Sequence, residues 1–210
     1  MFLDDKAVAA MLLGAAKLLE ENADRLSEID SRFGDGDHGI TMRKIARLIE
    51  EQIPQWGNRS IQTFLDDLGT AVMEVKGGSA GPLYGALIGG LGVKLAEDEK
   101  ELDADALRRM FAGALEELQD LTAAKVGDKT MMDALIPAVE AVQEAEGDVR
   151  ELLQAGAEAA EAGAKASEGF ASKFGRARSY KEQTIGTPDA GAVSTALFIR
   201  GMAQGFENHK

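Results

Sequence analysis

Apolar residues recur every three or four positions along eight stretches of the chain, which is the spacing of an amphipathic α-helix. Alanine occurs 34 times and aromatic residues make up only 5% of the 210 positions, a composition that favours helices over strands. No stretch reads convincingly as a strand. The expected helices cover about 4–27, 39–52, 60–75, 82–97 and 148–168, and three more begin at Asp103, Asp128 and Thr187.

The connections between these stretches are mostly short, so neighbouring helices are expected to run antiparallel. No internal repeat and no low-complexity linker divides the chain. We therefore predict an all-α fold with one domain over residues 1–210, built as a helical bundle or barrel.

Charge and residue usage exclude several classes of function. The formal net charge of −13 disfavours binding to nucleic acid and to anionic membranes. The absence of cysteine excludes disulfides and thiolate metal sites, and two histidines, His38 and His209, are too few for a histidine-rich zinc site. The acidic N-terminus does not resemble a signal peptide, and no apolar run approaches the roughly 18 residues of a membrane span. We expect a soluble, cytoplasmic protein.

Three glycine-rich loops, over 30–39, 76–85 and 175–191, are longer than a simple helical bundle needs. The first holds Asp30, Asp35 and Asp37 on a segment whose glycines allow sharp turns. Carboxylates in such a turn are the oxygen ligands that Mg²⁺ prefers. The alternative interpretation is a solvated turn that caps the following helix.

Two other motifs in the first loop do not hold. The glycines at 34, 36 and 39 match the spacing of a dinucleotide-binding turn, but no strand precedes them. An EF-hand loop that starts at Asp35 would need a ligand at Gly39 and a glutamate at Ala46.

Residues 77–85 form a glycine- and serine-rich start to a helix, where backbone N–H groups can bind phosphate. The loop lacks the Gly-Lys-Ser/Thr of a Walker A motif, and its other interpretation is a tight turn with close helix packing. Two further helix starts, 127–132 and 187–191, contain glycine, and Arg176 and Arg178 place two guanidinium groups in the third loop. Each of these features alone is also consistent with an ordinary cap or a surface arginine.

In an up-and-down bundle, the loops before every second helix emerge at the same end. The acidic loop, the 77–85 loop, residues 127–131 and residues 187–191 would then share one rim, and the 175–186 segment leads into it. This arrangement favours a composite site for a nucleotide with Mg²⁺ over separate structural roles.

The motifs together are similar to the nucleotide-binding L subunit of the dihydroxyacetone kinases. The similarity runs in order through nearly the whole chain. It rests on Gly34-Asp35-Gly36-Asp37-His38-Gly39, Gly77-Gly78-Ser79-Ala80-Gly81-Pro82-Leu83-Tyr84-Gly85, Gly127-Asp128-Lys129-Thr130-Met131, Gly175-Arg176-Ala177 and Asp189-Ala190-Gly191-Ala192.

The resemblance implies a barrel of eight antiparallel amphipathic helices, with ADP or ATP and two Mg²⁺ ions bound at one end. It implies that Asp30, Asp35 and Asp37 bind the metal ions. The nucleotide contacts that it implies are His38, Thr41, Ser79, Ala80, Thr122, Met131, Arg176, Asp189, Ala190 and Gly191.

The same resemblance implies a phosphotransferase that acts only with a partner. The acceptor, dihydroxyacetone, would be held covalently on a separate K subunit, and ADP would stay bound as a coenzyme that a phosphoenolpyruvate phosphotransferase-system protein recharges. Three alternatives stay open: direct use of ATP, another short ketose such as a tetrulose, and a nucleotide-sensing regulator without catalysis. A plain helical interaction module would not need three aspartates and two glycine-rich loops at one end.

Overall fold

The computed structural model describes residues 2–209, and in this range the chain forms α-helices and short 3-10 segments but no strand. One isolated antiparallel bridge joins Leu3 to Leu102. The all-α prediction is thus confirmed. The helices are α1 (Asp5–Glu21), α2 (Ala23–Asp30), α3 (His38–Gln52), α4 (Ile61–Met73), α5 (Ala80–Val93), α6 (Ala104–Leu121), α7 (Met132–Glu144), α8 (Val149–Ala166) and α9 (Ala190–Asn208). The 3-10 segments are Ile53–Gln55, Ser167–Gly169 and Arg176–Thr184.

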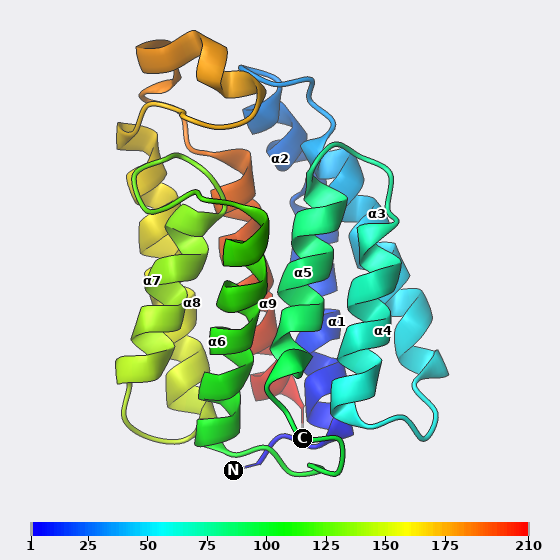
Figure 1. Ribbon diagram of the computed structural model, residues 1–210. Coiled ribbons are helices and arrows are strands. Elements are labelled where there is room, and N and C mark those ends of the chain that lie inside the picture. Colours follow the sequence, from blue (N-terminus) through cyan, green and yellow to red (C-terminus); the bar gives the residue numbers. More distant parts are fainter. Residues whose placement is uncertain (1, 210) are drawn as a thin grey trace.

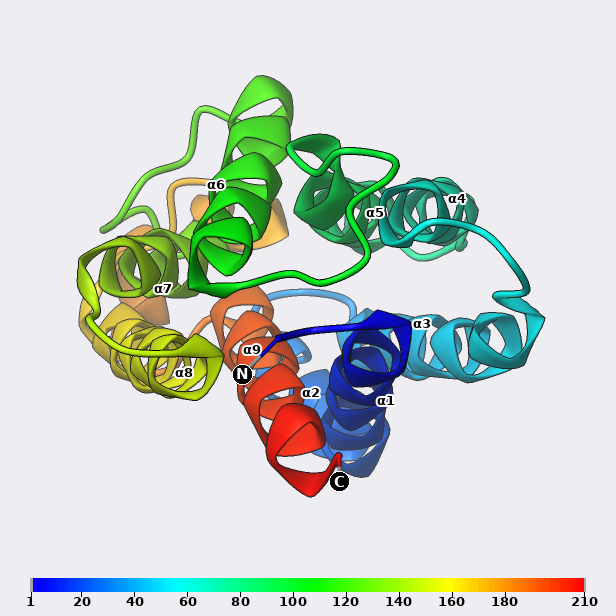
Figure 2. The same ribbon diagram turned by 90° about the horizontal axis from the view of Figure 1, so that it is seen from below.

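The long helices run side by side along one direction, as Figure 1 shows. In the end-on view, α1, α3, α4, α5, α6, α7, α8 and α9 follow one another around the molecule (Figure 2). The most extensive packing joins α1 to α9 and α4 to α5. No helix within residues 2–209 combines the length and the apolar character that a membrane crossing requires.

Buried apolar side chains and close glycine contacts hold these helices together. The apolar faces predicted from the sequence are buried, with side chains such as Ile45, Leu65 and Phe198 fully enclosed. Where α1 meets α9 the two backbones approach closely, and a Cβ on Gly14 would lie 2.1 Å from the carbonyl oxygen of Gly201. Glycine at this contact therefore lets two helices pack at a distance that no larger residue allows.

The structure has nine α-helices over residues 2–209 where the sequence predicted eight, because the expected helix 4–27 is divided at Asn22. The side-chain amide of Asn22 donates to the Leu18 carbonyl, which also accepts the backbone N–H of Asn22. Asn22 thereby ends α1 and directs α2 toward the upper end of the molecule (Figure 1).

Two other predicted helix starts were wrong by a few residues. Helix α7 begins at Met132 and not at Asp128, because the Asp133 carboxylate accepts the N–H groups of Gly127 and Thr130 and holds 127–131 as a turn. Helix α9 begins after Asp189, whose carboxylate accepts the Ala192 N–H at 2.8 Å and caps the helix.

Candidate functional site

The loops that precede α3, α5, α7 and α9 meet at one end of the molecule and line a cavity of about 590 Å³. The prediction that these loops share a rim is confirmed. The cavity wall includes every predicted site residue except Thr41, namely Asp30, Asp35, Asp37, His38, Ser79, Ala80, Thr122, Met131, Arg176, Asp189, Ala190 and Gly191.

The three aspartates of the first loop converge on one point of this wall. Asp30 ends α2, while Asp35 and Asp37 precede α3, and one carboxylate oxygen from each lies within 4.8 Å of the others. The Asp30 carboxylate also accepts the Gly36 N–H at 2.8 Å. A Cβ at position 34 would lie 2.3 Å from an Asp30 carboxylate oxygen, so glycine is needed there for the loop to close around Asp30. Three such oxygens fit a hard divalent cation.

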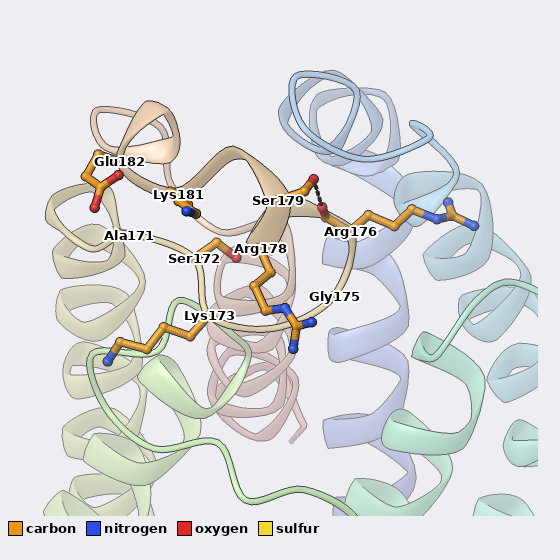
Figure 3. A pocket seen from close by; sticks show the side chains of 9 residues that line it. All are labelled: Ala171, Ser172, Lys173, Gly175, Arg176, Arg178, Ser179, Lys181 and Glu182. Carbon is orange, nitrogen blue, oxygen red and sulfur yellow. Dashed lines mark hydrogen bonds between the residues drawn. The ribbon is translucent and has the colours of Figure 1, made fainter.

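The segment from Ala171 to Gly186 lies across the rim and contacts the acidic loop twice. The Arg176 guanidinium pairs with the Asp35 carboxylate, and the Tyr180 ring packs on the Phe33 ring with centroids 5.2 Å apart. In Figure 3 the Arg176 side chain extends away from the other labelled residues toward the acidic loop. This segment therefore encloses the cavity on one side.

A second hollow of about 720 Å³ lies against the same segment and is lined by residues 171–173, 175, 176, 178, 179, 181 and 182. Figure 3 shows Lys173, Arg178 and Lys181 around it. The Lys173 ammonium pairs with Asp128 at 2.7 Å. Four basic residues and one acidic residue, Glu182, therefore line the hollow, which makes it mainly cationic.

Glycines 77 and 78 turn the second loop over the start of α3. A Cβ on Gly77 would lie 1.9 Å from the Thr41 hydroxyl oxygen, which puts Thr41 directly beneath the loop. Thr41 is 1% exposed, and its hydroxyl donates to the Asp37 carbonyl at 3.2 Å. The structure therefore places Thr41 in the support of both loops and not in the cavity wall.

Sequence reasoning missed Ser194, which contacts His38, and Tyr84, which contacts Ser194. The His38 Nε2 atom lies 2.8 Å from the Ser194 hydroxyl, and the buried Tyr84 hydroxyl donates to the same oxygen at 2.8 Å. Burial lowers the pKa of His38, while the Asp30 charge and the Ala190 carbonyl oppose this shift. Burial raises the pKa of Tyr84 to about 12. Tyr84 lies within the quoted glycine motif, but nothing in the sequence connects it to α9.

Lys129 is a further residue that sequence reasoning missed. It is 4% exposed, has a left-handed φ of 61°, and its ammonium donates to the carbonyls of Ser167, at 2.6 Å, and of Thr187. Burial lowers the pKa of Lys129, and the Asp189 and Asp133 carboxylates oppose this shift. Lys129 thus joins three chain segments in the wall of the cavity.

Asp189 is expected to make stability fall as pH rises. Burial raises the pKa of Asp189 from its ordinary value of 3.8 to about 7. The Asp133 charge adds to this shift and the Lys129 charge opposes it. Between these two values the folded chain keeps a proton that the unfolded chain has released, so the free energy of unfolding decreases with increasing pH.

The measurement is urea denaturation of Asp189→Asn beside the unchanged protein from pH 4 to pH 8, since asparagine still caps the helix but does not titrate. The variant is expected to gain relative stability through this window, by up to about 1.4 kcal/mol per pH unit. The His38 contribution cancels in this difference. A difference between the two proteins that does not change with pH would contradict the prediction.

Comparison with known proteins decides the family. The family model described as the DAK2 domain matches residues 32–204. The chain belongs to the DAK2 domain family. The resemblance seen in the motifs is therefore confirmed over most of the length of the chain.

Relatives of this DAK2 domain have two sizes. The chain is 33% identical to the "PEP-dependent dihydroxyacetone kinase 2, ADP-binding subunit DhaL" of Listeria innocua, over 95% of the chain and 94% of that protein. It is 34% identical to the "L-erythrulose kinase" of Pectobacterium atrosepticum, over 91% of the chain. The chain spans about a third of the length of that erythrulose kinase.

A solved structure shares the fold of this DAK2 domain. The dihydroxyacetone kinase of C. freundii, crystallised in complex with AMP-PNP and Mg²⁺, superposes with a TM-score of 0.70 and 26% sequence identity. The match covers 94% of this chain and 33% of that protein. That relative therefore binds a nucleotide analogue and Mg²⁺ on a chain that contains this fold.

Proposed function

We propose that this DAK2 domain is the nucleotide-binding part of a kinase that phosphorylates dihydroxyacetone. The observation that carries the proposal is the convergence of three aspartates, a glycine-rich helix start and Arg176 on one cavity. These are the parts that phosphoryl transfer needs: carboxylates for metal ions, backbone N–H groups for phosphates, and a cation for developing charge. We also propose that residues 1–210 form a single domain and that its eight long helices close into a barrel. The packing of α9 on both α1 and α8 supports this closure.

The residues present fit a magnesium site. Asp30, Asp35 and Asp37 would hold two Mg²⁺ ions, and the relative crystallised with AMP-PNP and Mg²⁺ supports this assignment. Bound Mg²⁺ neutralises charge on phosphate oxygens and polarises them toward transfer. Arg176, which pairs with Asp35, would be available to contact the phosphates if the Asp35 carboxylate held a metal ion.

The rest of the cavity wall orients the nucleotide. The N–H groups at Ser79 and Ala80, where α5 begins, would contact phosphate oxygens. Thr122 at the end of α6 and Met131 before α7 would contact the base and ribose, together with His38. Asp189, Ala190 and Gly191 start α9 beneath them, and a Cβ on Gly191 would lie 3.3 Å from the Met131 nitrogen, so this floor is tightly packed.

The phosphoryl acceptor in this proposal is held by a partner. The DhaL relatives are named ADP-binding subunits, which supports a partner subunit. The family resemblance implies that this partner is a K subunit that holds dihydroxyacetone covalently. Relatives named erythrulose kinases favour a four-carbon ketose as the second candidate substrate. A nucleotide-sensing regulator is the alternative without catalysis, and the complete aspartate triad argues against it.

The proposed phosphoryl donor is a nucleotide that stays bound to this domain. It is bound as ADP, and a phosphoenolpyruvate-driven phosphotransferase-system protein recharges it. The Phe33–Tyr180 contact supports it, because it joins the 171–186 segment to the acidic loop without using the Asp35 carboxylate, and an enclosed cavity releases a nucleotide slowly. Direct exchange of ATP is the alternative.

One experiment tests the nucleotide assignment and the donor together. The chain is purified without added nucleotide and denatured, the released nucleotide is identified by chromatography, and Mg²⁺ is measured in the same sample. We expect about one ADP per chain, together with Mg²⁺. If the purified protein contains no nucleotide but binds ATP and ADP reversibly, ATP is used directly and ADP is not a bound coenzyme. Failure to bind either nucleotide would overturn the proposed function.

A further inference from the structure

A buried chain of hydrogen bonds connects α5 to the cavity through α9 and ends on His38. We propose that Tyr84 and Ser194 are positioning residues that hold the His38 ring with its hydrogen on Nε2. The nitrogen left for a bound nucleotide is then Nδ1. The proposed role of His38 in nucleotide binding rests on the proposed function, whereas the orientation of its ring does not.

The position of the hydrogen follows from what each atom of the chain can donate. The Ser194 hydroxyl lies 3.0 Å from the Gly191 carbonyl, and a carbonyl only accepts, so the single Ser194 proton is used there. Its oxygen can then only accept from its other two neighbours, the Tyr84 hydroxyl and His38 Nε2, both at 2.8 Å. The contacts of Ser194 therefore place the hydrogen of the neutral ring on Nε2. The competing arrangement, with the hydrogen on Nδ1, would serve the nearby Ala190 carbonyl, and it is the outcome that overturns the proposal.

Tyr84 keeps Ser194 in this arrangement. The Tyr84 side chain is 1% exposed and packs edge-on against Phe198, with ring centroids 6.0 Å apart, so its hydroxyl has little freedom to turn. The other hydroxyl near it, that of Thr195, is more distant at 3.4 Å. If the buried Tyr84 hydroxyl no longer donated to Ser194, it would lose its shorter hydrogen bond, which costs about 1–3 kcal/mol.

The tautomer of His38 decides which kind of ligand group can form a hydrogen bond with its Nδ1 atom. A neutral ring with its hydrogen on Nε2 offers only a lone pair at Nδ1, which accepts a hydrogen bond. A hydroxyl group of a bound nucleotide satisfies that nitrogen, and a phosphate oxygen does not. The ring is held before any ligand arrives, so binding does not have to select one tautomer.

The test is ¹⁵N NMR of the imidazole nitrogens at pH 8.5, without nucleotide. The chain has two histidines, and His209→Gln removes one, so the His38 signals are identified directly. We expect the Nε2–H form in the unchanged protein, a mixture of both tautomers in Ser194→Ala, and a smaller shift toward the mixture in Tyr84→Phe. Thr195→Ala is the matched control, because it removes a neighbouring buried hydroxyl that does not contact His38.

An Nδ1–H form in the unchanged protein, or an unchanged Nε2–H form in a folded Ser194→Ala, would overturn the proposal. The second measurement is ADP affinity with Mg²⁺, expected to fall by up to about 10-fold in Ser194→Ala and to stay constant in Thr195→Ala. If Ser194→Ala changes the His38 tautomer but leaves the ADP affinity constant, the tautomer has no role in nucleotide binding. Absence of ADP binding by the unchanged protein would overturn the proposed function and leave the NMR result standing.

Discussion

Replacing Asp35 and Asp37 together with alanine is expected to abolish Mg²⁺-dependent ADP binding and to leave the helical fold intact. The two carboxylates converge with Asp30 on one point of the cavity wall, and neither supports a helix through a side-chain cap. A hydrogen bond or contact to a charged group contributes about 1.5–3 kcal/mol, so losing two predicts at least about a 100-fold lower affinity.

The measurement is ADP affinity by calorimetry, in Mg²⁺ and in EDTA. Without Mg²⁺ the variant should bind ADP no worse than the unchanged protein, because two negative charges that repel phosphate are gone. The ratio of the two affinities is therefore expected to fall to about one. A double variant of Glu97 and Asp98 removes the same charge from an exposed turn beyond the far end of α5 and should keep the full ratio. An unchanged ratio in the Asp35/Asp37 variant would contradict the metal assignment.

Those parts of the molecule that depend on local sequence were predictable. The apolar period gave the long helices, and the alternation of their connections placed the acidic loop and the 77–85 loop at one end. The gathering of Asp30, Asp35 and Asp37 was also predictable, because all three lie within eight residues and glycines between them allow the turn.

Contacts between distant segments were not predictable. Ser194 lies 156 positions after His38, and the apolar pattern of α9 gives no reason to connect the two residues. The division at Asn22 depends on one side chain that competes with the helix for the Leu18 carbonyl, a local choice that the apolar period does not record. Thr41 is similar, because only the path of the backbone at Gly77 shows that it lies under the loop.

Lys129→Met is expected to be the most destabilising single change in the wall of the cavity, lowering the free energy of unfolding by about 3 kcal/mol. Its ammonium is the hydrogen-bond donor to the carbonyls of Ser167 and Thr187, and a buried acceptor left without a donor costs about 1–3 kcal/mol. Methionine has nearly the same side-chain volume as lysine but carries no charge. The nearby Asp133 and Asp189 carboxylates therefore also lose a buried cation.

Urea denaturation at pH 7.5 measures this loss, and Lys173→Met is the matched control. Lys173 pairs with the Asp128 carboxylate, which is 6% exposed, but the Lys173 side chain is 58% exposed and Asp128 still accepts the Lys125 N–H, so removal of Lys173 should cost less than removal of Lys129. Lys129 is buried and Lys173 is exposed, so the contrast between the two variants separates the effect of burial from the effect of losing one positive charge. Equal losses in both variants would mean that the Lys129 contacts do not hold the start of α9, and the floor of the cavity would then depend on the Asp189 cap alone.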